Sequence, residues 1–181
     1  MDELNPYIQR WYERGCERGQ DEKWDPFDKF FYFWIALVVA ATQHGNLTDR
    51  HPLGDRKPIL NYFRAKRSSV IGAEEARRLE VKKLVRMKEV IAPKTRCRKE
   101  VRDAFDNLRA HYDKSKVLED SELVEPIVEV LNRVRNNLFH GRKTYTDKND
   151  LKVLKAANPI LLEILNRCEL WLSHAATNTT Q

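Results

Sequence analysis

The sequence predicts an all-α protein, a single-domain helical bundle of about five to seven helices. The charged fraction is 33%, and the chain contains only 6 glycines and 7 prolines, a composition typical of a helical protein and not of a disordered or all-β one. Apolar residues recur at steps of three and four along most of the chain, and no stretch keeps the alternation of a half-buried strand. At 181 residues the chain can bury a core of its own, so we expect residues 1–181 to form one domain.

Two prolines mark the starts of the first two helices. Pro6 follows Asn5 and Pro26 follows Asp25, which fits a capping side chain followed by proline in the first turn. The first helix is expected to turn one face inward, formed by Tyr7, Ile8, Trp11, Tyr12 and Cys16. From Phe27 onwards the second helix is apolar on nearly every side, which predicts either the central core helix or a helix that lies partly in a subunit interface.

The middle and the end of the chain contain five more helical segments. Three are predicted in the middle: one that Pro58 opens, one over residues 73–90 that Pro93 stops, and one over residues 95–114. Two long ones follow, over residues 121–141 after a cap at Asp120 and Ser121, and over residues 150–176 with a kink or restart at Pro159.

The helix over residues 121–141 ends in a dense polar cluster. Its apolar residues lie on one face: Val124, Ile127, Leu131, Val134 and Leu138. Arg135 lies at the edge of that face, whereas Asn136 and His140, four residues apart, lie one above the other on the flank beyond it. Gly141 then supplies a residue that can end the helix in a left-handed conformation. The three polar side chains are therefore expected beside a buried seam, on the last turns of a helix.

These residue types fit the chemistry of RNA cleavage. An imidazole such as that of His140 can both donate and accept a proton near neutral pH. The planar guanidinium of Arg135 suits phosphate oxygens, and Asn136 can orient either the His140 imidazole or the phosphate by hydrogen bonds. Because RNA carries its own nucleophile, the ribose 2′-OH, this reaction needs proton transfer and charge stabilisation but no metal.

Residues 135–141, Arg-Asn-Asn-Leu-Phe-His-Gly, resemble the Arg-x4-His signature of the HEPN superfamily, in the form found in its Apea-like branch. The resemblance implies a small all-helical HEPN domain and a metal-independent endoribonuclease, with Arg135 and His140 in catalysis and Asn136 in a supporting role. It also implies a toxin or an anti-phage defence effector, with an antitoxin or regulatory partner. Cleavage through the 2′-OH would leave a 2′,3′-cyclic phosphate or its hydrolysis product.

The spacing of the motif bears on its assembly. Side chains five residues apart on a helix point about 140° away from each other, so one Arg135–His140 pair does not converge easily. The resemblance implies a homodimer, in which two copies of the motif build one composite cleft. Two alternatives remain: a non-catalytic module that binds RNA, a nucleotide or a protein partner, and a purely structural subunit in which Arg135 and His140 stabilise a helix end.

The charge distribution is compatible with an RNA partner. The formal net charge is +6, and basic residues are concentrated between positions 64 and 99. That stretch is either a guide for a phosphate backbone or a solvated helix face. Arg142 and Lys143 directly follow the motif, and we expect them to bind RNA next to the cleavage site.

Metal, cofactor and membrane partners are not expected. The cysteines Cys16, Cys97 and Cys168 are odd in number and form no CxxC pair, which argues for a reducing compartment and against a structural zinc site. The most apolar stretch, residues 30–41, is shorter than the ~20 residues that a spanning helix needs. No signal peptide is recognisable at the start of the sequence, so the expected location is the cytoplasm.

Overall fold

The protein is all-helical, as predicted. The computed structural model describes residues 6–17, 25–44, 56–66, 75–93, 97–115, 118, 120–139 and 147–167. Within these ranges it contains eight helices and no strand. The helices are α1 (Pro6–Glu17), α2 (Asp25–His44), α3 (Arg56–Lys66), α4 (Glu75–Arg86), α5 (Lys88–Ile91), α6 (Lys99–Tyr112), α7 (Asp120–Phe139) and α8 (Lys148–Arg167).

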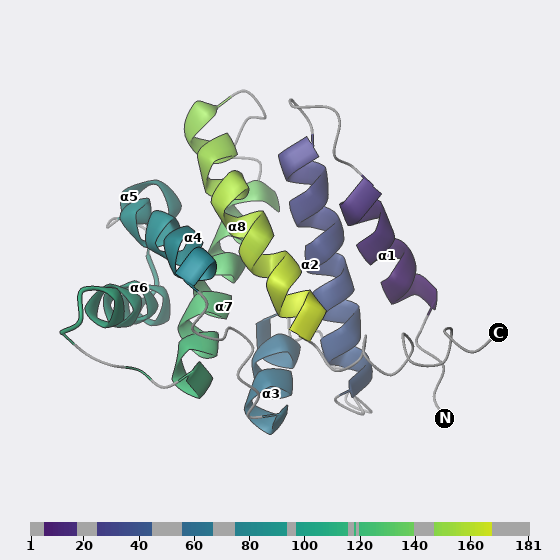
Figure 1. The fold of residues 1–181 in the computed structure, drawn as a ribbon, viewed down its shortest axis with the longest axis horizontal. Coiled ribbons are helices and arrows are strands. Elements are labelled where there is room, and N and C mark those ends of the chain that lie inside the picture. The colour runs from purple at the N-terminus through teal and green to yellow at the C-terminus, as the bar shows by residue number, and fades with distance from the viewer. Residues whose placement is uncertain are drawn as a thin grey trace.

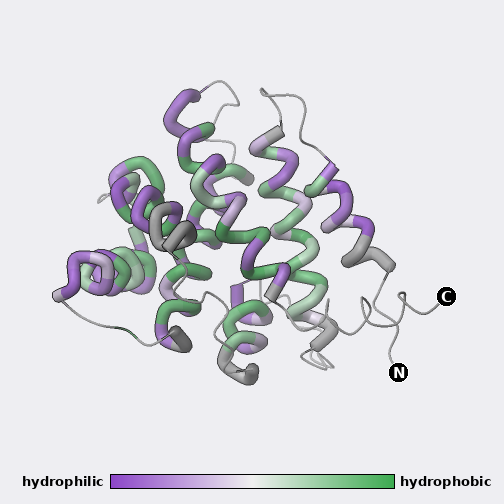
Figure 2. The backbone as a smooth tube through the Cα atoms, in the orientation of Figure 1, coloured by the Kyte–Doolittle hydropathy of each residue, from purple (hydrophilic) through white to green (hydrophobic). Residues whose placement is uncertain are grey.

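Helices α2, α7 and α8 connect the two sides of the bundle (Figure 1). Helix α2 packs against α1, α3 and α8, and α8 in turn packs against α4. Helix α7, which carries the motif, packs against α3 on one side and α6 on the other, with the short α5 near its end. Figure 2 shows hydrophobic residues along α2, α7 and α8, whereas α1 is mostly hydrophilic.

The apolar helix α2 is a core helix. Phe30, Trp34 and Leu37 are almost completely buried, and the rings of Phe30 and Trp34 stack with their centroids 6.1 Å apart. Among the residues whose side chains the structure describes, Phe31 is the only large hydrophobic one that is exposed. Burial against three helices of the same chain explains the composition of α2, so its apolar character does not require a subunit interface.

One predicted helix is divided, which raises the helix count above the predicted five to seven. The segment expected over residues 73–90 is interrupted at Met87, where the φ and ψ angles are −91° and 19°. The N–H of Met87 is shared between the carbonyls of Lys83 and Leu84, at 3.2 and 3.0 Å, as is common where a helix ends. Helix α4 therefore ends at Arg86, and the single turn α5 follows before the predicted stop at Pro93.

Prolines lie inside two helices. Helix α8 continues through Pro159, so of the predicted kink or restart at this residue the restart is wrong, and the kink stays a prediction. Pro126 lies inside α7, where no break was predicted. A proline removes one backbone hydrogen bond, and the packing of both helices in the bundle offsets that loss. Residues 168–176 of the predicted last helix lie outside the described residues.

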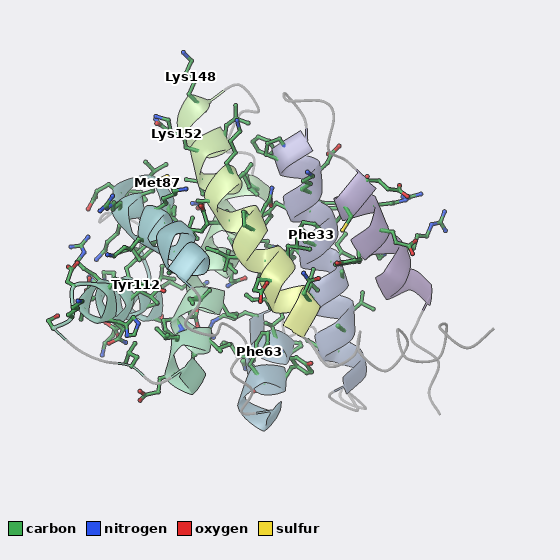
Figure 3. All side chains as sticks on the ribbon, in the orientation of Figure 1. Phe33, Phe63, Met87, Tyr112, Lys148 and Lys152 are labelled. Carbon is green, nitrogen blue, oxygen red and sulfur yellow. The ribbon has the colours of Figure 1, made fainter. Side chains whose placement is uncertain are left out.

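The inner face of α1 differs from the predicted one at its end, because Cys16 is exposed and Gly15 is buried. A Cβ atom added to Gly15 would lie only 2.6 Å from Cδ1 of Phe33, which is labelled on α2 in Figure 3. Glycine therefore permits the close approach of α1 and α2.

Replacing Gly15 with alanine is expected to destabilise the protein, although alanine favours a helix by ~1 kcal/mol over glycine. The overlap with Phe33 should lower the free energy of unfolding by about 1–2 kcal/mol, measured by denaturant titration. Glu17→Ala, at an exposed position of the same helix, is the control. Phe33→Leu should recover part of the loss in the double variant, and a Gly15→Ala protein more stable than wild type would contradict the close packing described here.

Candidate functional site

The last turns of α7 lie where the sequence placed them, beside a buried seam. Leu131 and Val134 are 0% and 2% exposed, and Leu138 is half-buried against the core. The apolar face predicted from the three-and-four spacing is therefore confirmed. Its burial fixes the rotation of α7 and with it the direction of the polar flank.

Arg135 and Asn136 lie together on that flank, and both are half-buried. Nη1 of Arg135 donates a hydrogen bond to Oδ1 of Asn136 at 3.0 Å. This bond holds the guanidinium against the helix, and it aligns the two residues that the motif places side by side. His140, Arg142 and Lys143 lie outside the described residues, so their predicted positions stay predictions.

Two further side chains tie the end of α7 to α5. Nδ2 of Asn137 donates to the carbonyl of Ile91 at 2.7 Å, and Nε of Arg133 donates to the same oxygen at 3.3 Å. Ile91 is the last residue of α5, where backbone carbonyls lack partners within the helix. Neither contact could be predicted from the sequence, because α5 was not expected as a separate turn with its own end.

A buried carboxylate lies next to the motif helix. Asp150, in the first turn of α8, is 3% exposed and shares a small cavity with Asn137 and Leu138. The partial positive charge at a helix N-terminus favours a carboxylate in this position. The sequence marked Asp150 only as a helix start. Its position shows that α8 packs beside the last turns of α7.

A hollow of about 150 Å³ opens beside Asn136, between α3, α6 and α7. We call it the arginine hollow; its polar lining includes Arg56, Arg98, Glu129, Asn132, Arg133 and Asn136. Sequence spacing could not reveal it, because its lining comes from three helices that are far apart in the chain. It adjoins the motif through Asn136 alone.

One side of the arginine hollow is held by a half-buried ion pair between α3 and α7. Arg56 and Glu129 are ion-paired, and Nε of Arg56 donates to Oε1 of Glu129 at 2.7 Å. The Glu129 side chain is 6% exposed and that of Arg56 is 35% exposed. The hydrogen bond to Glu129 raises the pKa of Arg56 above its ordinary value. The pair thus fixes α3 against the motif helix.

The basic stretch between positions 64 and 99 is partly neutralised by neighbours. Lys83 forms an ion pair with Glu80, and Lys88 forms one with Asp106 of α6. These contacts favour the solvated-face interpretation for this part of the stretch. Arg98, just before α6, differs: it is exposed and forms no ion pair or side-chain hydrogen bond with another described residue.

The described residues contain no group of three or more His, Cys, Asp or Glu side chains that could hold a metal ion. None of the described helices is both long and apolar enough to span a bilayer.

Comparison with known proteins adds no relative: no family model, no curated protein and no solved structure matches this chain. The fold and the site therefore define an all-α protein with an Arg-Asn pair at the end of a helix, beside an arginine-lined hollow.

Proposed function

We propose that the protein is a metal-independent endoribonuclease of HEPN type, with Arg135, Asn136 and His140 at its active site. The observation that carries the proposal is the Arg135–Asn136 hydrogen bond on the last turns of α7, beside a buried seam and next to a cationic hollow. The resemblance of residues 135–141 to the HEPN signature supports it. It also supports a role as a toxin or anti-phage effector, with an antitoxin or another regulatory partner.

In the proposed reaction, the 2′-oxygen of a ribose forms a bond to the adjacent phosphorus, and the bond from phosphorus to the 5′-oxygen breaks. His140 moves the proton, taking it from the 2′-OH or giving it to the leaving 5′-oxygen. Arg135 stabilises the negative charge that develops on the phosphoryl oxygens. Asn136 holds the guanidinium in position through Oδ1. The products are a 2′,3′-cyclic phosphate, or its hydrolysis product, and a free 5′-OH.

Purified protein incubated with mixed RNA in excess EDTA tests this function. The expected result is cleavage with 2′,3′-cyclic phosphate ends in the wild type and no cleavage by His140→Ala. RNA binding without cleavage by the wild type would instead select the non-catalytic module.

The active site is proposed to be composite, built by two copies of the chain around a two-fold axis. The reason is the geometry of an ideal helix, on which side chains five positions apart, as Arg135 and His140 are in the sequence, would point about 140° away from each other. If each site takes its arginine from one copy and its histidine from the other, a mixed dimer of Arg135→Ala and His140→Ala chains contains one intact site.

Mixing these two inactive variants should therefore restore activity to roughly one-quarter of the wild-type level, since about half of the dimers are mixed and each has one working site. Light scattering on the same samples should give the mass of a dimer. No recovery from a mixture that does exchange subunits, or full activity from a monomer, would contradict the composite site.

The RNA strand is proposed to reach the motif from the end of α7, where Arg142 and Lys143 follow the helix. Lys148 and Lys152, both exposed, extend outward from the neighbouring start of α8 (Figure 3). Beyond the arginine hollow, toward the start of α7, the groove between α6 and α7 is mostly acidic, because Asp103, Glu122 and Glu125 line it.

Replacing both Arg142 and Lys143 with alanine should weaken RNA binding at all sequences alike. It should also reduce the slope of log Kd against log salt by roughly one to two units, because each phosphate contact releases counterions. Arg10→Ala with Arg14→Ala on α1 removes the same charge at a distance from the motif and should leave most of the slope. If the salt dependence of RNA binding stays unchanged when Arg142 and Lys143 are replaced, these residues do not contact phosphates.

A further inference from the structure

We infer that the arginine hollow is a binding site for a phosphate group, distinct from the reacting centre at Arg135 and His140. The phosphate could belong to an RNA strand or to a free nucleotide or phosphate ion. The site itself does not depend on the proposed nuclease function, whereas its use for an RNA strand does. The hollow of about 150 Å³ is far larger than the ~15 Å³ that one water molecule needs.

The first observation is an unpartnered buried amide. Asn132 lines the hollow and is 9% exposed, so its side chain is more than nine-tenths covered. It forms no side-chain hydrogen bond with another described residue. An anion bound in the hollow would accept a hydrogen bond from Nδ2 of Asn132, a contact that no described residue makes.

The second observation is the surplus of positive charge. Three guanidinium groups and two carboxylates, those of Glu100 and Glu129, line the hollow, which leaves one positive charge in excess. Arg56 and Glu129 neutralise each other, and Nε of Arg133 donates to the carbonyl of Ile91, so Arg98 is the cation of the lining that is most available to a ligand. Arg98 has no carboxylate partner among the described residues. An anion is therefore the ligand that the lining favours, and guanidinium groups suit phosphate oxygens.

The third observation is the start of α6. Arg98 is its N-cap residue and makes no side-chain capping bond, while Glu100 and Val101 of the first turn line the hollow. The N–H groups of a first turn and the helix dipole both favour a phosphate. Asn132 and Arg133 face this helix end from α7, so donors from two helices surround one space.

The position of the hollow relates it to the proposed reaction. Its lining includes Asn136, the residue bonded to Arg135. A phosphate in the hollow would thus lie beside the reacting phosphate and not in its place. If the nuclease function holds, the group bound here is another phosphate of the same RNA strand.

Titration calorimetry with inorganic phosphate tests the site without any cleavage. Arg98→Ala is expected to weaken phosphate binding by about 10- to 100-fold, because a hydrogen bond between two charged groups is lost. Asn132→Asp, which adds a negative charge to the lining, should abolish binding. Arg102→Ala, at an exposed position of the same helix that does not line the hollow, is the charge-matched control and should bind as the wild type does.

No phosphate binding by the wild type at tens of millimolar, or equal binding by the wild type, Arg98→Ala and Asn132→Asp, would overturn the site. A second titration, with a 2′-O-methyl RNA that cannot be cut through the 2′-OH, identifies the source of the phosphate. Weaker binding of this RNA by Arg98→Ala assigns the hollow to the strand, and unchanged binding assigns it to a free anion. A wild type that binds phosphate but leaves RNA intact in EDTA would confirm the hollow and refute the nuclease.

Discussion

Replacing His140 with alanine is expected to reduce the rate of RNA cleavage by about 10²–10⁴-fold, because proton transfer to and from the ribose and leaving oxygens is lost. Arg135→Ala is expected to lose about 10²–10³-fold, because the charge on the phosphoryl oxygens is then less well stabilised. Asn136→Ala should be milder, since Asn136 acts on the substrate through the guanidinium that it holds. Single-turnover cleavage of a defined RNA measures all three effects.

Two controls separate chemistry from folding. Arg135 is half-buried, so its alanine variant could lose packing as well as charge. Arg135→Lys keeps the charge and most of the stem but lacks the planar fork, and it should recover only part of the activity. Circular dichroism and the unfolding midpoint should stay near the wild-type values for His140→Ala. Wild-type cleavage by either alanine variant would remove that residue from the proposed mechanism.

Replacing Arg56 with alanine is expected to lower the free energy of unfolding by about 3 kcal/mol, more than any other single change in the arginine hollow. The loss arises because Glu129, with a side chain only 6% exposed, is left as a buried carboxylate without its cation. Glu129→Ala should cost less, about 1 kcal/mol, since the Arg56 side chain is 35% exposed and can turn to water. Urea denaturation of the two variants measures the asymmetry.

The double variant Arg56→Ala with Glu129→Ala should be more stable than Arg56→Ala alone, because no buried charge is then left unpaired. Lys57→Ala, at an exposed neighbouring position of α3, serves as the control for helix propensity. Equal losses for the two single variants would show that Glu129 gains compensating contacts when Arg56 is removed. A larger loss of stability for Arg56→Ala than for Glu129→Ala would therefore support a buried, unpaired Glu129 as the cause.

The spacing of apolar residues predicted those helices that bury a continuous apolar face. The apolar face of α7 was predicted from its three-and-four spacing, and the core position of α2 was predicted from its apolar composition. Both predictions succeeded because apolar residues in these patterns are buried against the rest of the chain. The Arg135–Asn136 hydrogen bond was not predicted, because residues one apart on a helix do not face each other, and Asn136 was expected to orient His140 or the phosphate. The proline-marked starts of α1 and α2, by contrast, were predicted from local chemistry.

The features that escaped the sequence depend on contacts between distant segments. Arg56 and Glu129 are 73 positions apart, and Asn137 bonds to a carbonyl 46 positions away. The role of Gly15 also depends on a distant segment, because its lack of a side chain is what lets α2 approach α1. No local spacing encodes such pairings, because they depend on how the helices are arranged around α2 and α7.

The most direct test of the proposed chemistry is the cleavage, in excess EDTA, of two RNA oligonucleotides that differ in one atom, the 2′-oxygen of the ribose at the preferred cleavage position. The all-ribose oligonucleotide should be cut there and leave a 2′,3′-cyclic phosphate. Its partner with a single 2′-deoxyribose should stay intact at that bond, because the nucleophile is missing. Equal cleavage of the two would contradict attack by the 2′-OH, and with it the roles proposed for Arg135 and His140.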